Sequence, residues 1–243
     1  MKFFCIKTDN VFDIADEING SCKYVLTEGE RIGFCFPIHG WQPPKIVQEF
    51  ISKCTFSNRN NNYCFVLCTC GSEIGLAMDI FAKVLKKIGL CANSMFSVKM
   101  PNTYICLPFM DTDGENLEKE KIHNANIELK RIANYIKNYS CGIESLTKGP
   151  VPFILTYVIG ELFKLCMLTD KPFRVDYNKC INCGRCAKSC PTNNIVYDIN
   201  KNPKWKHINK CTCCMACYHI CPTHAINYGI MTQHKGQYYF RNK

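Results

Sequence analysis

The sequence predicts an α/β protein in which a parallel sheet carries helices on both faces and a small α+β domain follows. Over residues 1–110, short and continuously apolar segments alternate with segments of helical period, which is typical of a doubly wound parallel sheet. From Asp176 onward, cysteines, lysines and small residues dominate and the helical period disappears. Such a short segment has too few apolar residues for a core of its own, so we expect a metal to stabilise it.

Six segments have the composition of buried strands. Most of them are apolar throughout their middle, as strands covered on both faces are. The predicted strands are Lys2–Ile6, Tyr24–Thr27, Arg31–Phe36, Tyr63–Thr69, Met95–Lys99 and a short extension at Thr103–Leu107.

Five segments are predicted to be helices. In one of them Ile74, Met78, Phe81 and Leu85 recur at helical spacing, and Gly89 suits the end of that helix. The predicted helices are Val11–Asn19, Pro44–Lys53, Ile74–Ile88, Glu115–Tyr139 and Val151–Met167.

The segment Val151–Met167 is very apolar, but Glu161 and Lys164 interrupt it. No stretch reaches the about 18 uninterrupted apolar residues of a transmembrane helix, so none is expected. We expect this helix to pack between domains, and a role at a membrane surface is the alternative. The predicted organisation is a domain over residues 1–145, a connecting helix over 146–172 and a second domain over 173–243.

The 20 cysteines of this 243-residue chain indicate metal binding rather than disulfides. The N-terminus has only a short apolar run before charged residues begin, which is too short for an export signal. We therefore expect a cytoplasmic protein with reduced thiols. Eight of the cysteines form an internal repeat, because Cys180–Pro191 and Cys211–Pro222 both read C-x2-C-x2-C-x3-C-P at an offset of 31 residues.

This spacing is the known ligand pattern of bacterial 4Fe–4S ferredoxins. Three cysteines at two-residue intervals wrap a loop around one face of a cubane, and the fourth begins a short helix that leads to the other cluster. A proline after it is tolerated in the first helical turn. The predicted ligands are Cys180, Cys183, Cys186 and Cys221 for one cluster and Cys211, Cys214, Cys217 and Cys190 for the other.

Zinc is the alternative metal, but structural zinc sites use C-x2-C pairs without a third cysteine at that interval. Cys213 lies out of register beside Cys214. It is a spare ligand, a site of oxidation or a neighbour without a role. His207, His219 and His224 are not expected to be ligands, because each cluster already has four thiolates.

The whole net charge of +10 belongs to the C-terminal part of the chain. Residues 1–145 hold 16 Lys and Arg and 16 Asp and Glu, whereas residues 146–243 hold 14 against 4. A basic surface attracts acidic redox proteins, such as a free ferredoxin, a flavodoxin or an oxidoreductase. No recognised nucleic-acid motif accompanies the charge, so no nucleic-acid partner is expected.

The segments Arg31–Phe50, Val66–Gly75 and Lys99–Tyr104, together with the two cysteine motifs, resemble a known family. It is that of the EFR-type fusions, in which a flavodoxin-like domain precedes a bacterial two-cluster ferredoxin. The resemblance covers nearly the whole chain. It implies a sheet of order 2-1-3-4-5 with FMN at the carboxyl edge of the strands.

The resemblance also implies which loops face the flavin. In the first loop only Thr8 and Asn10 match the family's phosphate-binding run, and Lys7 and Asp9 replace its glycines. Trp41 would stack on the flavin ring or pack between domains, and Cys70 would be redox-active or a small buried side chain. The candidate flavin contacts are Thr8, Asn10, His39, Gly40, Trp41, Thr69, Cys70, Gly71, Asn102 and Tyr104.

Two hypotheses follow. In the first, the chain carries single electrons through two 4Fe–4S clusters to or from FMN, as a shuttle or a component of an anaerobic oxidoreductase. No substrate pocket or acid–base group is evident in the sequence, so chemistry of its own is left open. In the second, the chain is an iron–sulfur binding or sensing module whose first domain has lost FMN and serves as a docking platform.

Overall fold

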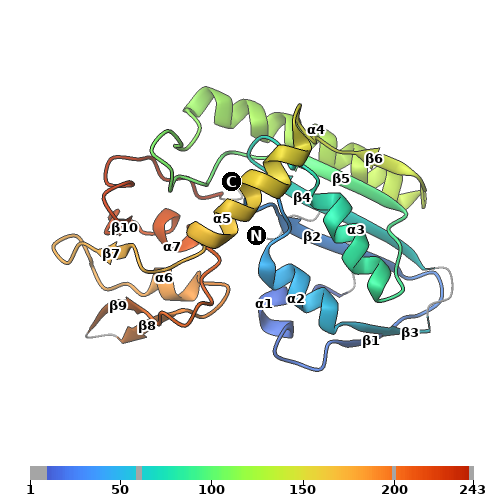
Figure 1. Cartoon of the computed structure of the whole chain (residues 1–243), viewed down its shortest axis with the longest axis horizontal. Helices are drawn as coiled ribbons and strands as arrows, with labels where there is room; N and C mark the ends of the chain where they lie inside the picture. The colour runs from blue at the N-terminus through green and yellow to red at the C-terminus, as the bar shows by residue number, and fades with distance from the viewer. Residues whose placement is uncertain (1–9, 59–61, 199–200, 241–243) are drawn as a thin grey trace. The chain divides into compact units, whose positions relative to one another are not determined.

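The computed structural model describes residues 10–58, 62–198 and 201–240, and its contacts divide the chain into two compact units (Figure 1). The first unit comprises Met1–Met100 and Lys119–Glu161, and the second comprises Pro101–Glu118 and Leu162–Lys243. Each unit is therefore assembled from two separate stretches of chain. The predicted strand Lys2–Ile6 lies outside the described residues.

A four-stranded parallel sheet forms the centre of the first unit. Its strands are β2 (Arg31–Pro37), β4 (Tyr63–Cys70), β5 (Ser94–Lys99) and β6 (Ile143–Ser145), in that order. The predicted parallel sheet is thus confirmed. The order 2-1-3-4-5 stays a prediction, because its first strand is not described. In addition, β1 (Lys23–Val25) pairs with β3 (Thr55–Ser57) in a separate parallel sheet.

Helices cover both faces of this sheet. On one face, α2 (Lys45–Lys53) and α3 (Ala77–Lys87) join Phe34 and Phe36 of β2 in a single apolar core. On the other face, α4 (Glu115–Lys137) packs on β5, where Tyr135 stacks on Phe96 with ring centroids 6.2 Å apart. The strand β4 is buried along most of its length, whereas alternate residues of β2 are exposed.

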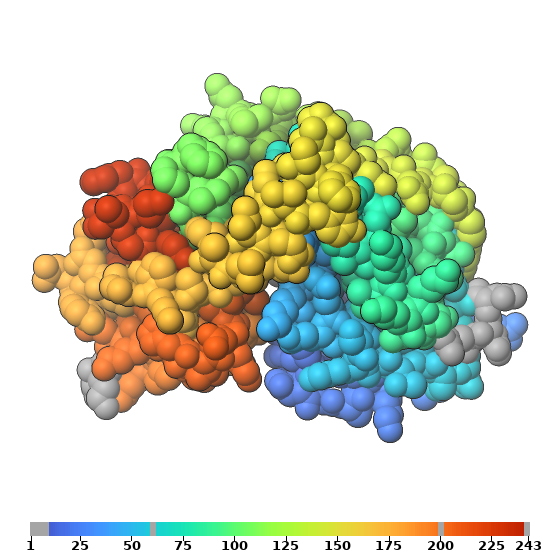
Figure 2. Space-filling view, viewed as in Figure 1, coloured from blue at the N-terminus to red at the C-terminus, as the bar shows by residue number. Residues whose placement is uncertain are grey.

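Two predicted helices differ from expectation. The first is reduced to α1 (Ile14–Glu17), which begins where the Asp13 carboxylate accepts a hydrogen bond from the Ala15 N–H (3.0 Å). The predicted helix Val151–Met167 is a π-helix, η1 (Ile154–Ile159), followed by α5 (Gly160–Cys166). Figure 2 shows this yellow segment at the surface. None of the described helices combines the length and the apolar character needed to cross a membrane.

The second unit has small sheets and two one-turn helices. The strand β7 (Phe173–Val175) pairs with β10 (Ile226–Tyr228), and β8 (Ile195–Asp198) pairs with β9 (Lys201–Trp205), both antiparallel. Its helices are α6 (Arg185–Lys188) and α7 (Ala216–His219). These helices occupy equivalent positions in the two cysteine motifs, so the sequence repeat is also a structural repeat.

The segment Pro101–Glu118, named the cap below, belongs to the second unit, although it follows β5 of the first unit and ends in the first turn of α4, whose remainder belongs to the first unit. The predicted strand Thr103–Leu107 lies in the cap and is wrong, because these residues have no strand partner. Ile105 and Cys106 are instead buried in the core of the second unit, which explains the apolar run in this part of the sequence.

Candidate metal centre

Each cysteine motif folds as a tight loop that leads into a one-turn helix. In the first loop Asn182 (φ 55°) and Gly184 (φ 69°) have left-handed backbones, and in the second loop Cys213 (φ 50°) and Met215 (φ 58°) have the same conformation at the equivalent positions. This conformation turns the chain sharply and costs most residues about 1 kcal/mol or more. Two loops of one shape therefore present their cysteines in the same way.

The first loop surrounds a cavity, named cavity 1, with an empty volume of about 340 Å³ that includes its opening to solvent. Three cysteines of the first motif and one of the second are on its wall. They are Cys180, Cys183, Cys186 and Cys221. The rest of the wall is part apolar, with Ile181, Pro203, Ala225 and Ile226, and part polar, with Asn182, Arg185 and Thr223.

The second loop surrounds a matching cavity, named cavity 2, of about 310 Å³ by the same measure. Its wall contains three cysteines of the second motif and the last cysteine of the first. They are Cys211, Cys214, Cys217 and Cys190. Phe173, Ile195 and Trp205 make its other side apolar. The structure thus brings together the same two sets of four cysteines that the sequence predicts.

Backbone N–H groups point at several of these sulfurs. The Asn194 N–H donates to Cys190 Sγ and the Ala225 N–H donates to Cys221 Sγ, both at 3.2 Å. Burial raises the pKa of Cys186 to about 11 and that of Cys211 to about 12, so these thiols hold their protons at neutral pH. A metal that binds them as thiolates must displace those protons.

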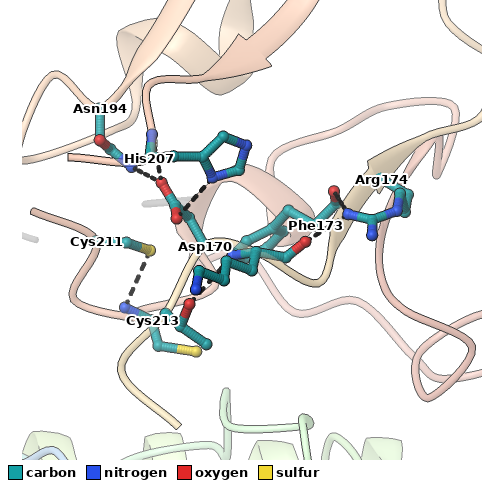
Figure 3. Close-up of polar contacts among 9 residues, drawn as sticks. Asp170, Phe173, Arg174, Asn194, His207, Cys211 and Cys213 are labelled. Atoms are coloured by element: carbon teal, nitrogen blue, oxygen red, sulfur yellow. Dashed lines mark hydrogen bonds and ion pairs between the residues drawn. The ribbon is translucent and has the colours of Figure 1, made fainter. Parts of the chain in front are cut away.

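A buried carboxylate lies beside cavity 2 (Figure 3). Asn194 Nδ2 donates to Asp170 Oδ2 (2.7 Å), the His207 N–H donates to the same oxygen (3.1 Å), and His207 Nδ1 lies 2.9 Å from Oδ1. Burial by itself would raise the pKa of Asp170, but these hydrogen bonds outweigh it and lower the pKa. Because Asn194 also binds Cys190, this network fixes the backbone at the wall of cavity 2.

The three histidines near the motifs have structural partners. His207 binds Asp170, and His224 Nε2 lies 2.6 Å from the Tyr218 hydroxyl. His219 is buried, its Nδ1 accepts from the Tyr238 N–H (3.2 Å), and its Nε2 lies 2.7 Å from the Thr103 carbonyl oxygen. None of the three is on the wall of either cavity.

Cys213 points away from cavity 2 and into the cap. Its Sγ lies 3.9 Å from Cys106 Sγ, and Cys106 Sγ lies 3.2 Å from Met215 Sδ. All three side chains are at most 2% exposed. The sequence does not predict this contact, because only the apolar run around Cys106 indicates that the cap is buried.

The predicted flavin loops meet in part. His39, Gly40 and Trp41 follow β2, Thr69 and Cys70 end β4, and Pro37 pairs with Thr69, so these residues share one edge of the sheet. Gly71 follows directly. Asn10 is exposed, and Thr8 lies outside the described residues.

Asn102 and Tyr104 belong instead to the second unit. The Asn102 N–H donates to Asp113 Oδ2 (2.9 Å), and the Tyr104 ring packs on Phe163 with centroids 5.1 Å apart. Their expected place with the other flavin contacts is therefore not supported. The local motif carried no signal that the chain leaves the sheet at this point.

The shared edge of the sheet is covered by residues 147–161 of the same unit. The Leu76 N–H donates to Thr156 Oγ1 (2.8 Å), and Thr156 Oγ1 donates to the Trp41 carbonyl (3.3 Å). The Ile74 N–H donates to the Thr147 carbonyl (3.0 Å). The N–H groups of Ile74 and Leu76 at this edge are thus already hydrogen-bonded within the chain.

The packing there is close. A Cβ added at Gly75 would lie 2.3 Å from Thr156 Oγ1, and one added at Gly160 would lie 2.7 Å from the Gly40 carbonyl oxygen. Gln42 is buried and donates to the Thr156 carbonyl (2.9 Å) and to Glu161 Oε1 (2.7 Å). These loops do not fit a flavin in this structure, because another part of the chain fills the edge.

Cys70 is buried at this edge. Burial raises the pKa of its thiol to about 11, although Lys99 and Lys121 oppose the shift. The thiol is therefore protonated at neutral pH and behaves as a small buried side chain.

Comparison with known proteins identifies one segment. A family model described as a 4Fe-4S dicluster domain matches residues 173–222. This range contains all eight cysteines of the two motifs, so the chain holds a dicluster domain of ferredoxin type. No curated protein and no solved structure matches the chain.

Proposed function

We propose that this chain transfers single electrons through two 4Fe–4S clusters in its second unit. One cluster would be held by Cys180, Cys183, Cys186 and Cys221, and the other by Cys211, Cys214, Cys217 and Cys190. The observation that carries the proposal is the composition of the two cavity walls, each with three cysteines of one motif and the fourth of the other. Bound clusters of this kind supply one-electron chemistry at low potential.

The cavities fit a polynuclear cluster better than zinc. Four thiolates on one zinc ion lie about 2.3 Å from the metal, so their sulfurs must converge on a point. Here the four thiols of each set are arranged on the wall of a cavity. In the described ranges, no three His, Cys, Asp or Glu side chains gather closely enough to hold a single ion.

The chain's own groups would set the electrostatics. The N–H groups of Asn194 and Ala225 stabilise negative charge on the sulfurs of Cys190 and Cys221. The excess of basic residues after residue 145 adds a positive potential that favours the reduced state. The apolar residues of the walls limit the access of water.

The proposal assigns no electron-transfer step to FMN. The sheet edge that would hold the ring is filled by Thr156 and its neighbours, and Asn102 and Tyr104 belong to the second unit. These observations favour the hypothesis in which the first unit is a docking platform without flavin. An acidic redox protein or an oxidoreductase is the proposed partner, because residues 146–243 hold 14 Lys and Arg against 4 Asp and Glu.

The test is anaerobic purification followed by measurement of iron, acid-labile sulfide, zinc and flavin in one sample. We expect about eight iron and eight sulfide per chain and no flavin. Cys214→Ser should remove about half of the iron. Cys166→Ser, at an exposed cysteine on neither cavity wall, should leave it unchanged. About two zinc ions and no sulfide would refute the proposal, and one FMN per chain would refute the flavin-free first unit.

A further inference from the structure

The two motif loops have the same backbone but different surfaces. Apart from the final proline, each position that is exposed in the first motif is buried or half-buried at the equivalent position of the second. In the first motif, Ile181 is 62% exposed, and Cys183, Arg185 and Lys188 are also exposed. Their equivalents in the second motif are Thr212, Cys214, Ala216 and His219, of which the first three are half-buried and His219 is 7% exposed.

The cap contacts the second loop at three residues. Cys106 touches Met215 (3.2 Å) and lies beside Cys213, and the Thr103 carbonyl oxygen lies 2.7 Å from His219 Nε2. The equivalent residues of the first motif are Gly184, Asn182 and Lys188. The sequence therefore departs from the repeat at the positions where the second loop meets the cap.

A lysine near the C-terminus holds the cap in place. Lys235 Nζ donates to the carbonyl oxygens of Ile105 (2.8 Å), Met110 (2.7 Å) and Leu107. The Gly236 N–H donates to Asp111 Oδ1 (2.9 Å). Four hydrogen bonds from two consecutive residues thus tie the cap to the rest of the second unit.

The exposed first loop has the character of a docking surface for an acidic protein. Arg185 and Lys188 supply positive charge on α6, and Lys179 precedes the loop. Ile181 adds an apolar contact, and the exposed Cys183 is on the wall of cavity 1. Positive charge steers an acidic protein toward this surface, and an apolar contact stabilises the complex once it has formed. Here the charged and the apolar side chains both lie beside cavity 1.

We propose that the surface formed by Lys179, Ile181, Cys183, Arg185 and Lys188, named the first-loop face, is where an acidic redox protein docks and exchanges electrons. The inference rests on the proposed function. One electron leaves the reduced protein of the pair and is taken up by the oxidised one, without bond or proton transfer. At the second loop Ala216 takes the place of Arg185, and His219, in the place of Lys188, is buried against the cap. The two ends of the pseudo-symmetric module are therefore not interchangeable.

The test compares two double charge reversals in the full-length protein. Lys179→Glu with Lys188→Glu changes the first-loop face at exposed residues that are not on the wall of cavity 1. Lys206→Glu with Lys210→Glu makes the same change of charge at exposed residues before the second motif. The probe is a purified acidic two-cluster ferredoxin, reduced beforehand, and the readout is the rate of electron transfer by stopped flow at low and high salt.

We expect the first pair to slow transfer at least tenfold at low salt and to weaken its salt dependence, and the second pair to slow it less than threefold. Iron and sulfide contents should stay at the wild-type level in both. If the content is normal and the first pair has no larger effect than the second, the docking proposal is overturned. If wild-type protein lacks iron and sulfide, the proposed function itself fails.

A second measurement needs no variant. A soluble gadolinium chelate should broaden the NMR signals of the Cys183 β-protons more than those of the Cys214 β-protons. Equal broadening would mean that the cap does not distinguish the two loops, and it would overturn the inference.

Discussion

The hydroxyl of Thr156 should hold two loops of the first unit together, and Thr156→Val removes it with little change in shape. The side chain is 0% exposed, accepts from the Leu76 N–H at 2.8 Å and donates to the Trp41 carbonyl at 3.3 Å. In the valine variant a buried N–H loses its acceptor, which costs about 1–3 kcal/mol. The longer bond to Trp41 adds less, so we expect a total of about 2 kcal/mol.

Hydrogen exchange at the Leu76 amide measures this locally. A loss of about 2 kcal/mol corresponds to roughly 30-fold faster exchange if the site exchanges by unfolding of the first unit. Thr156→Ser keeps the hydroxyl and serves as the control, with only the loss of a methyl group. Wild-type protection of Leu76 in the valine variant would refute the bridging role and weaken the case that this edge is filled.

Three further predictions concern other parts of the chain. Gly184→Ala should lower the occupancy of the first cluster, because φ is 69° there and the new Cβ would lie 2.7 Å from the Tyr197 ring. Iron analysis checks this, and the additional substitution Tyr197→Ala should restore part of the lost iron. Lys235→Met should free the cap and speed hydrogen exchange at residues 103–107, because three carbonyls lose one ammonium donor; unchanged exchange would show that the apolar contacts suffice. Burial lowers the pKa of His39 from 6.5 to about 4, so the first unit has its full stability above pH 6.5 and loses part of it as the pH falls toward 4. Urea unfolding at pH 7 and pH 5 should show that the free energy of unfolding of the first unit falls by about 1–2 kcal/mol. His39→Gln should abolish this difference.

Local patterns were enough for the main strands and for the cysteine loops. The strands β2, β4 and β5 fall within about a residue of their predicted bounds, because a strand buried in a parallel sheet is a continuous apolar run that can be recognised in the sequence. The strands β3 and β6 have three residues each and no such run, so they were missed. Three cysteines on each cavity wall were predictable from the spacing within one motif, and the fourth, from the other motif, followed from the known ligand pattern of two-cluster ferredoxins.

Contacts between distant segments could not be predicted in the same way. Thr156 is 115 residues from Trp41, and Cys106 is 107 residues from Cys213. The local sequence of the loops predicted to contact flavin does not indicate that η1 covers them. The apolar run Tyr104–Leu107 is ambiguous between a strand and a buried irregular segment, and only its packing decides.

The interleaving of the two units has a practical consequence for dissecting the protein. A fragment that begins near residue 162 would contain both cysteine motifs, yet it would lack the cap, which the chain supplies from a distant position. In such a fragment Met215, Cys213 and Ile226 would lose part of their apolar cover and face water. The C-terminal fragment expressed alone should therefore fold incompletely and aggregate. Co-expression with the N-terminal fragment, or fusion of residues 101–118 to the C-terminal fragment through a linker, should restore folding.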